Sequence, residues 1–200
     1  MQPRISIITI CYNAASTITR TLRSVSAQTY PNIQYLIIDG ASKDNTLELV
    51  RELAPEAEIY SERDKGIYDA MNKGLDRATG DYVWYVNAGD ALVSPTTVED
   101  LVRATCTGDS LPDVLYGDTR LIDAEDHDLG LRRLRPPHQL DWRSFRAGML
   151  VCHQAFVAKR TISPHYDLSY RFSADVDWCI RVLKEAKTTA FYPEPIALYL

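Results

Sequence analysis

The sequence predicts an α/β fold: a single domain whose mixed, mainly parallel sheet is flanked by helices. Strand-like and helix-like segments alternate through the first 90 residues, and such alternation favours parallel strands joined by right-handed helical crossovers. The chain has 200 residues and a hydrophobic content of 46%, which is enough to bury the core of one domain. After residue 90 the alternation becomes less regular, so we expect a different arrangement in the second half.

Four strands are expected in the first half, because four short runs are rich in β-branched or aromatic residues. They span residues 5–10, 33–38, 58–61 and 82–86, and the third is the weakest. Their continuous apolar character is typical of strands that are covered on both faces.

Three helices are expected between these strands. The first follows Ser16, the expected N-cap, and ends before Pro31. The second covers residues 44–53, where apolar side chains recur at helical spacing. The third begins at Ile67 and is stopped by Gly80.

The second half is expected to contain two more helices and several strands. Residues 95–104 and 177–183 have helical spacing, with Ser173 close before the latter. The charged stretch 121–137 is either an antiparallel hairpin or a mobile lid. Because the chain ends inside an apolar run, we expect the native protein to extend beyond residue 200. Apolar runs predict strands at residues 114–118, 149–157, 191–192 and 196–200.

Composition excludes several classes of protein. The net charge of −5 gives no basic footprint, so we expect no nucleic-acid partner. The four cysteines include no CxxC pair, which favours buried thiols in a reducing compartment. The start of the chain has no secretory apolar region, and no apolar run approaches the ~20 residues that span a bilayer, so we expect a cytoplasmic protein. The sequence also lacks the phosphate-binding motifs GxxxxGK(S/T) and GxGxxG, the GxSxG elbow and zinc-type Cys/His spacing.

Four aspartates lie beside predicted strand ends or helix starts, where polar groups converge in an α/β domain. They are Asp39, Asp90, Asp175 and Asp177. Such a set suits metal-assisted transfer, in which a divalent ion neutralises a diphosphate and a carboxylate takes a proton from an attacking hydroxyl. The structural alternatives are that Asp39 begins a turn and that Asp177 stabilises a helix N-terminus by ~0.3–1 kcal/mol.

Two further features have alternative interpretations on sequence alone. His153 lies within an apolar run and is either a ligand or hydrogen-bond donor, or a core residue whose polar atoms are satisfied. Arg132, Arg133 and Arg135 either clamp the phosphates of a substrate or form a solvated basic loop.

Five segments of the first half, in this order, resemble the family 2 glycosyltransferases of the GT-A fold. They are residues 5–13 (ISIITICYN), 24–32 (SVSAQTYPN), 37–46 (IIDGASKDNT), 64–74 (DKGIYDAMNKG) and 78–82 (ATGDY). The resemblance implies a Rossmann-like GT-A sheet and the transfer of a sugar from a nucleotide-sugar to an acceptor hydroxyl, usually with inversion at the anomeric carbon. Bacterial surface-polysaccharide synthesis is the usual setting of such enzymes.

The resemblance also implies roles for residues that match the family's motifs. Asp39 falls where a carboxylate contacts the nucleotide base, and a carboxylate can accept from the N3–H of uracil. Asp175 matches the position of the catalytic base, with Asp177 as the close alternative. Thr9, Tyr12 and Asn13 fall where the first strand and loop meet the nucleotide, and Lys65, Asn72 and Lys73 belong to the block around the diphosphate.

The chain departs from the family pattern at residues 87–90. Many relatives carry two or three aspartates there, whereas this chain has Asn87-Ala88-Gly89-Asp90. Asp90 is the remaining anionic ligand for a divalent cation, Mn²⁺ or Mg²⁺. The amide oxygen of Asn87 can also coordinate a hard cation, although a site with less negative charge binds it more weakly.

The sequence therefore predicts an inverting glycosyltransferase that uses a nucleotide-sugar, a UDP-sugar being the expected donor, and a glycan or lipid-linked acceptor. Residues 1–90 are expected to form the nucleotide-sugar-binding half of one GT-A domain and residues 91–200 the acceptor-binding half. A lipid-linked acceptor would require peripheral association with the inner face of the plasma membrane. The alternatives are a catalytically silent nucleotide-sugar-binding module and a nucleotidyltransferase, although residues 11–15 lack the glycine-rich basic loop of the latter class.

Overall fold

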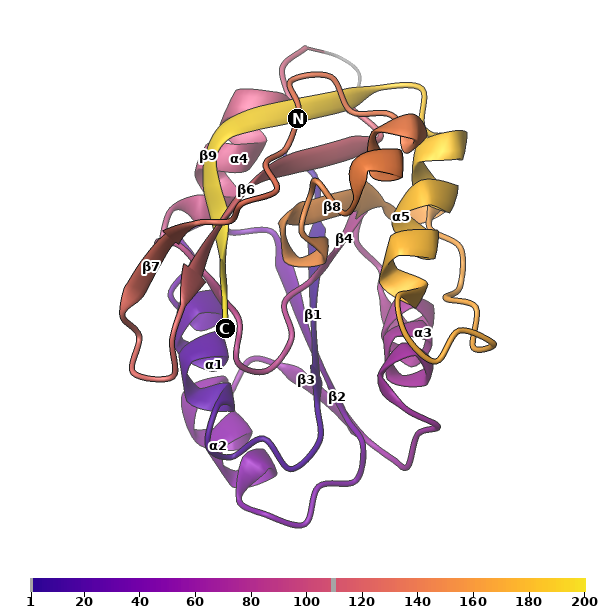
Figure 1. Ribbon diagram of the computed structural model, residues 1–200. Helices are drawn as coiled ribbons and strands as arrows, with labels where there is room; N and C mark the ends of the chain where they lie inside the picture. Colours follow the sequence, from indigo (N-terminus) through magenta and orange to yellow (C-terminus); the bar gives the residue numbers. More distant parts are fainter. Residues whose placement is uncertain (1, 109–110) are drawn as a thin grey trace.

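A computed structural model describes residues 2–108 and 111–200 and places one nine-stranded mixed sheet between helices (Figure 1). The strand order is β3-β2-β1-β4-β8-β6-β9-β5, with β7 paired to β6. The strands are β1 (Ile5–Cys11), β2 (Ile33–Asp39), β3 (Glu58–Ser61), β4 (Tyr82–Tyr85), β5 (Ala91–Leu92), β6 (Val114–Ile122), β7 (Asp128–Leu131), β8 (Phe156–Lys159) and β9 (Thr189–Tyr199). The α-helices are α1 (Ile18–Ser26), α2 (Thr46–Leu53), α3 (Ile67–Arg77), α4 (Thr97–Thr105) and α5 (Ala174–Glu185).

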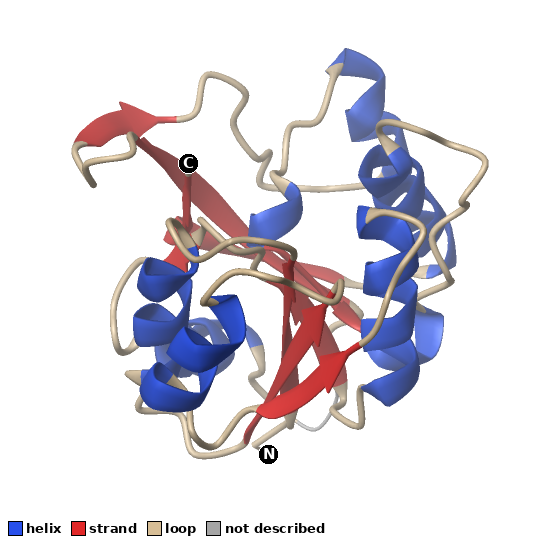
Figure 2. Ribbon diagram, turned by 90° about the horizontal axis from the view of Figure 1, so that it is seen from below, coloured by secondary structure: helices blue, strands red, loops and turns tan. Residues whose placement is uncertain are grey.

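The first half forms the parallel part of the sheet. β1 pairs in parallel with β2 and β4, and β2 pairs in parallel with β3. All seven residues of β1 are buried, as expected for a strand covered on both faces. α1 and α2 lie on the left of the molecule in Figure 1 and α3 and α5 on its right, and the view from below shows helices on both sides of the sheet (Figure 2). The predicted alternation of strands and helices is therefore confirmed.

The second half extends the sheet with mixed strand directions. β8 lies between β4 and β6 and is antiparallel to both, whereas β6 and β9 are parallel. β6 and β7 form an antiparallel hairpin, so the hairpin interpretation of the charged stretch is confirmed over its first part. This hairpin extends from the left of the molecule in Figure 1.

Two strand predictions for the second half were wrong. Residues 149–157 do not form one strand: a 3-10 turn, His153–Ala155, precedes β8. This turn lets two consecutive polar side chains reach different buried partners, since His153 bonds to Tyr166 and Gln154 to Asp90. The two short strands expected near the end are one strand, β9.

The continuity of β9 through its prolines has a structural reason. Proline cannot donate to a sheet ladder and is tolerated at bulges. Pro195 pairs with Asp118 where the register between β6 and β9 shifts. Gly117 lies opposite this bulge, and a Cβ atom there would lie 2.9 Å from the carbonyl oxygen of Glu194.

The helix boundaries needed smaller corrections. α1 has Thr17 at its N-cap rather than Ser16, and that residue makes no side-chain capping bond among the described residues. α5 begins at Ala174, three residues before the expected start. Trp142–Ala147 and Arg160–Ile162 are short 3-10 helices that the sequence pattern did not predict.

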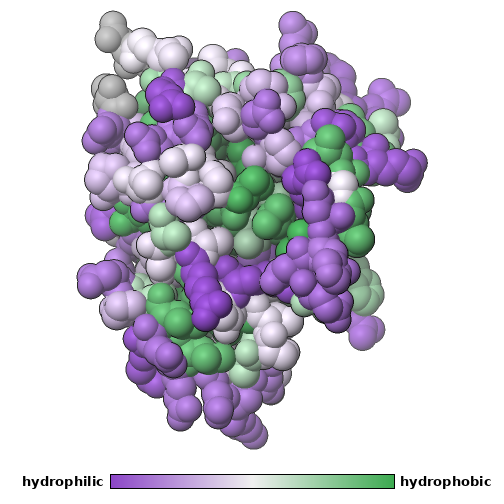
Figure 3. Space-filling model, turned by 90° about the vertical axis from the view of Figure 1, so that its left-hand side faces the viewer, coloured by the Kyte–Doolittle hydropathy of each residue, from purple (hydrophilic) through white to green (hydrophobic). Residues whose placement is uncertain are grey.

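The surface in Figure 3 is mostly polar, and the cysteines are unpaired. The face formed on the side of α1 and β7 is largely hydrophilic, with separate hydrophobic areas (Figure 3). Within residues 2–108 and 111–200, no helix combines the length and apolar character needed to cross a bilayer. All four cysteines are free, and three of them are buried, which confirms the expectation of unpaired thiols.

Candidate functional site

The polar loops that follow the parallel strands meet at one edge of the sheet. Cys11 at the end of β1 lies in register with Asp39 at the end of β2. Beside these loops a cleft of about 510 Å³ is open to solvent. Its lining includes Tyr12 and Asn13 after β1 and Asn87 after β4. Two residues predicted to meet the nucleotide and one predicted to coordinate the cation therefore line one cleft.

Two smaller hollows adjoin this cleft and share lining residues with it. One, of about 360 Å³, shares Tyr12 and Asp64 with the cleft and adds two cationic residues, Lys43 and Arg63. The other, of about 340 Å³, shares Gly66 and Ile67 with the cleft and extends past Tyr68 to residues 168–171. The three hollows form one groove along the carboxyl edge of the sheet, which is where open α/β sheets bind ligands.

The loop after β1 presents an aromatic face to solvent. Tyr12 is 61% exposed. The neighbouring Asn13 has φ 47°, in the left-handed region that asparagine tolerates. Its side-chain oxygen accepts from the Lys43 backbone N–H at 2.9 Å, and its own N–H donates to Ser42 Oγ at 2.8 Å. These bonds fix Asn13 to the loop after β2 and leave the ring of Tyr12 free to stack.

Asp39 and Thr9 lie beneath the groove rather than in it. Asp39 is fully buried, and its carboxylate accepts from the backbone and hydroxyl of Ser42 and from Ser61 Oγ. Thr9 is also fully buried, and its hydroxyl donates to the Val86 carbonyl at 2.7 Å. Both side chains hold the loops that shape the groove.

Asp64 is a groove residue that the sequence analysis did not single out. Its Oδ1 accepts from the Gly66 backbone N–H at 2.9 Å, which forms a tight turn before α3. A Cβ atom on Gly40 would lie 2.6 Å from Asp64 Oδ2 and 3.2 Å from the ring of Tyr12. Glycine at position 40 therefore allows these two side chains to approach the same point. The Asp-Lys-Gly segment was the sequence signal available for it.

The three residues of the predicted diphosphate block separate in the structure. Lys65 is exposed and lines the hollow that leads to residues 168–171. Lys73 donates to the Arg63 carbonyl at 2.7 Å and pairs with Glu62 and Asp69. Asn72 is buried and bonds to the backbone of Tyr166 in both directions, donating at 3.0 Å and accepting at 2.7 Å. Lys65 alone of the three reaches the groove.

Asn87 and Asp90 stand at the start and end of a tight turn after β4, in which the Asp90 N–H donates to the Asn87 carbonyl at 3.0 Å. The side-chain oxygen of Asn87 is buried and has no hydrogen-bond partner among the described residues. Asp90 is 5% exposed, and its carboxylate accepts from Gln154 Nε2 at 2.8 Å. An unsatisfied amide oxygen and a buried carboxylate are hard oxygen donors, the type that suits Mg²⁺ or Mn²⁺.

Burial raises the pKa of Asp90 to about 6. The hydrogen bonds from Gln154 and from the Leu200 N–H, and the charge of Arg20, lower the pKa by smaller amounts. The carboxyl is therefore ionised at neutral pH and protonated in mild acid. A divalent cation competes with that proton, so binding at Asp90 should weaken as the pH falls through about 6.

The two candidate bases face different surroundings on α5. Asp175 is half-buried, and the hydroxyl of Tyr68 donates to its Oδ1 at 3.4 Å. Tyr68 lines the groove. Asp177 instead accepts from Arg181 Nε at 2.7 Å within the same helix. The structure thus places Asp175 against Tyr68, a residue of the groove wall, and pairs Asp177 with Arg181.

The open alternatives for His153 and the arginines can also be compared with the structure. His153 is 3% exposed, its Nε2 bonds to Tyr166 Oη at 2.8 Å, and burial lowers its pKa to about 4, all as for a neutral core residue. Arg132 donates to the Met149 carbonyl, and Arg135 forms an ion pair with Asp118. Both arginines therefore hold partners in the fold, and the phosphate clamp stays a prediction.

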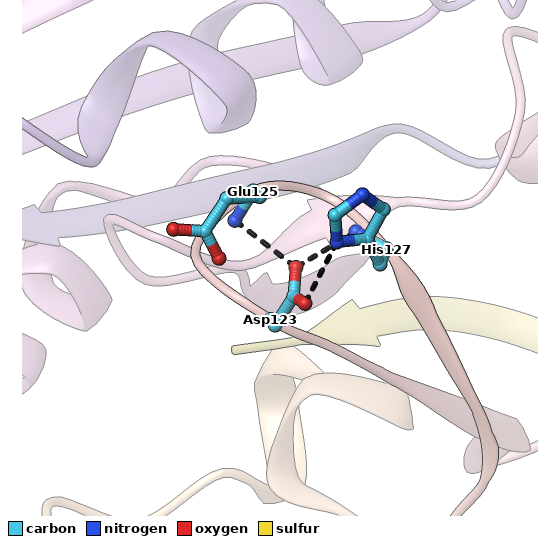
Figure 4. Close-up of side chains that lie close together, drawn as sticks. All are labelled: Asp123, Glu125 and His127. Atoms are coloured by element: carbon cyan, nitrogen blue, oxygen red, sulfur yellow. Dashed lines mark hydrogen bonds and ion pairs between the residues drawn. The ribbon is translucent and has the colours of Figure 1, made fainter.

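Another cluster of metal-ligand types lies at the tip of the β6–β7 hairpin. Figure 4 shows Asp123, Glu125 and His127 close together. The Asp123 carboxylate accepts from the backbone N–H groups of Glu125 and His127 and lies 3.0 Å from His127 Nδ1. Arg20 donates to the Asp123 carbonyl and pairs with Asp126. The cluster is accounted for by the turn of the hairpin.

Comparisons with known proteins agree with this geometry. The family described as "Glycosyl transferase family 2" matches residues 6–163. An uncharacterized glycosyltransferase of Mycobacterium tuberculosis is 33% identical over 186 residues, which cover 90% of this chain and 68% of that protein. A PGL/p-HBAD biosynthesis glycosyltransferase of the same species is 32% identical over 207 residues, which cover 98% of this chain and 77% of that protein.

Two solved structures are similar in fold at low sequence identity. Residues 1–349 of Staphylococcus aureus TarS, in complex with UDP-GlcNAc, give a TM-score of 0.77 at 16% identity, over 98% of this chain and 58% of that one. The mannosyltransferase PcManGT from Pyrobaculum calidifontis, in complex with GDP-Man and Mn²⁺, gives 0.72 at 18% identity, over 99% of this chain and 57% of that one. This chain spans less than two thirds of either solved structure.

Proposed function

The chain belongs to glycosyl transferase family 2 and has a GT-A fold, and from this premise we propose that it transfers a sugar from a nucleotide-sugar to an acceptor hydroxyl with inversion at the anomeric carbon. The observation that carries the proposal is the continuous groove, which joins Tyr12, Asn13 and Asn87 to the Tyr68 side chain that contacts Asp175. The loops proposed to bind the donor and the residue that contacts the half-buried Asp175 carboxylate thus line adjoining hollows.

In this proposal the nucleotide occupies the hollow around Tyr12. Its exposed ring offers a face on which a base can stack. Asp39 shapes this hollow from below through Ser42. Lys43 and Arg63 line the same hollow and would add positive charge around the nucleotide. A UDP-sugar is the donor we expect, and UDP-GlcNAc is bound in the TarS structure of similar fold.

The diphosphate would lie toward Asn87 and Asp90. These two residues would hold a divalent cation, which when bound supplies positive charge to the leaving diphosphate. The partner-free amide oxygen of Asn87 supports this role. PcManGT, which has a similar fold, is described in complex with Mn²⁺.

Asp175 is the proposed general base. Its carboxylate would take the proton of the acceptor hydroxyl while the acceptor oxygen bonds to the anomeric carbon and the bond from that carbon to the diphosphate breaks. A single displacement of this kind inverts the anomeric centre. Such proton transfer typically contributes ~10²–10⁴-fold to a rate.

The acceptor would enter from the hollow beside residues 168–171. Lys65 and Tyr68 form one wall of it, and the exposed side chains of Leu168 and Tyr170 form another. A sugar ring can pack against such aromatic and apolar groups. A glycan or lipid-linked intermediate of surface-polysaccharide synthesis would suit this mixed surface.

A thermal-shift screen tests the proposal at the level of binding. We expect one of UDP, GDP, CDP or dTDP to raise the melting temperature, because a ligand of the native state at 100 times its dissociation constant adds ~2.7 kcal/mol. A shift that disappears in EDTA supports a metal held by Asp90 and Asn87. A shift that persists in EDTA supports nucleotide binding by a transferase and contradicts the proposed metal site. If none of the four nucleotides changes the melting temperature, the proposal is contradicted.

A further inference from the structure

Tyr68 occupies an unusual place between the donor-side loop and the proposed base. It lies in the first turn of α3, directly after Gly66 and Ile67 of the groove. Its hydroxyl donates to Asp175 Oδ1, 3.4 Å away in the first turn of α5. Ser173, the N-cap residue of α5, makes no side-chain capping bond among the described residues and has φ 61°. The phenol of Tyr68, on α3, thus supplies a hydrogen bond to the first turn of α5.

One face of α3 holds the segment that leads into α5. Tyr68, Asn72 and Asp76 are spaced four residues apart and therefore lie on the same face of the helix. Asn72 bonds to the Tyr166 backbone in both directions. Asp76 Oδ1 lies 2.7 Å from His165 Nε2. These contacts fix the path of the chain before Asp175.

The ring of Tyr68 is fixed as firmly as its hydroxyl. It stacks on Tyr166 with centroids 5.8 Å apart and planes inclined by 18°. Tyr166 in turn stacks on Trp178 at 5.2 Å and 9°. A side chain held by such a stack can present its hydroxyl at one position without further loss of conformational freedom. Burial and the nearby charge of Asp175 both raise the pKa of Tyr68, so the phenol keeps its proton at neutral pH.

We propose that Tyr68 is a positioning residue for Asp175, holding the carboxylate beside the groove wall that Tyr68 lines and stabilising its ionised form through the phenol hydrogen bond. The proposal rests on the assignment of Asp175 as the base. Its content is specific to the hydroxyl: the aromatic stack alone would support α5, whereas the O–H group acts on the carboxylate. A hydrogen bond donated to the ionised form of an acid favours that form.

The titratable groups that face Asp175 keep one charge state around neutral pH. His153 has a pKa of about 4, and burial raises the pKa values of Tyr166, Cys179 and Tyr199. Asp177 on the same helix is paired with Arg181. A change in the Asp175 carboxyl signal that appears when the Tyr68 hydroxyl is removed therefore reports the bond between these two side chains.

The test compares Tyr68→Phe, which keeps the stacking ring and removes the hydroxyl, with Tyr60→Phe. Tyr60 is a matched control because its hydroxyl also donates to a carboxylate, Glu58 Oε2 at 3.2 Å, on β3. Carbon-13 NMR follows the side-chain carboxyl of Asp175, identified by the signal that is missing in Asp175→Asn. We expect its titration midpoint to move to higher pH in Tyr68→Phe and to stay unchanged in Tyr60→Phe.

Turnover supplies the second readout. With the nucleotide-sugar that the protein hydrolyses fastest among UDP-GlcNAc, UDP-glucose and GDP-mannose, Tyr68→Phe should lower kcat by roughly three- to tenfold, since bonds to charged groups carry more energy than neutral ones. The acid side of its pH–rate profile should move to higher pH, and the donor KM should stay the same. An unchanged carboxyl titration in Tyr68→Phe overturns the proposal whatever the rate does. Full activity in Asp175→Asn instead contradicts the base assignment, and the two failures are thereby distinguished.

Discussion

Replacing Asp175 with asparagine is expected to lower the rate of sugar transfer by roughly 10²–10⁴-fold, because the amide cannot take the proton of the acceptor hydroxyl. The side chain keeps its size, and its oxygen can still accept from Tyr68. The variant should therefore fold and bind nucleotide as the parent does. Steady-state kinetics with a saturating donor, together with calorimetry of nucleotide binding, separates the loss of turnover from any loss of affinity.

Asp177→Asn is the matched control for this prediction. It removes a carboxylate of the same helix two residues away, which the structure pairs with Arg181 at 2.7 Å. Pairs of this kind on a helix surface contribute about 0.3–0.5 kcal/mol, so we expect a small loss of stability and no loss of turnover. If instead Asp177→Asn were inactive and Asp175→Asn active, the assignment of the base would be reversed.

Replacing Asp90 with asparagine is expected to have opposite effects on activity and stability. Removal of the proposed anionic ligand should lower turnover by roughly 10²–10³-fold, the typical cost of losing one charge-stabilising group in an active site. The same change should stabilise the metal-free protein at neutral pH, because it removes a buried negative charge. Asparagine can still accept the hydrogen bond from Gln154.

The stability effect of Asp90 has a definite pH dependence. Burial raises its pKa from 3.8 to about 6, so the folded chain binds this proton more tightly than the unfolded chain does. The stability that Asp90 contributes is full below the unfolded value and is lost as the pH rises through about 6. We expect Asp90→Asn to exceed the parent in unfolding free energy by on the order of 2 kcal/mol at pH 8 and by much less at pH 4.

Urea unfolding in EDTA at these two pH values measures the difference. Asp126→Asn is a suitable control, because Asp126 has a side chain that is 67% exposed and pairs with Arg20 at the surface. Its effect should stay below about 1 kcal/mol at both pH values. A parent protein that is more stable than Asp90→Asn at pH 8 would contradict the account of a carboxylate destabilised by burial.

The parallel half of the fold could be predicted because its determinants are local. The β-branched run at 5–10 predicts a strand and the apolar spacing in α1 predicts a helix, and both elements were confirmed. The strand prediction for residues 149–157 was wrong because an apolar, buried run does not by itself distinguish a strand from a 3-10 turn. The partners that decide the matter, Tyr166 and Asp90, are distant in the sequence from His153 and Gln154.

The candidate site was predictable only in part for a similar reason. Tyr12 and Asn87 follow strands whose ends share an edge, so their placement in one cleft followed from topology. Thr9 and Asn72 were predicted to bind the donor as well, but their polar groups form hydrogen bonds within the fold, to Val86 and Tyr166. Which polar side chain faces a ligand depends on these long-range bonds. The position of Asp64 in the groove depends on Gly40, because a Cβ atom at residue 40 would collide with the Asp64 carboxylate.

The measurement that tests the central claim most directly is proton and phosphorus NMR of the purified chain with UDP-GlcNAc, UDP-glucose or GDP-mannose in the presence of Mg²⁺, which is diamagnetic, with water as the acceptor. We predict slow release of the nucleoside diphosphate, with the free sugar appearing first as the anomer of inverted configuration, and loss of that release in Asp175→Asn. Donors that bind but stay intact would indicate a silent nucleotide-sugar-binding module. Formation of a nucleoside triphosphate on addition of pyrophosphate would indicate a nucleotidyltransferase, and either result would contradict the proposed transfer.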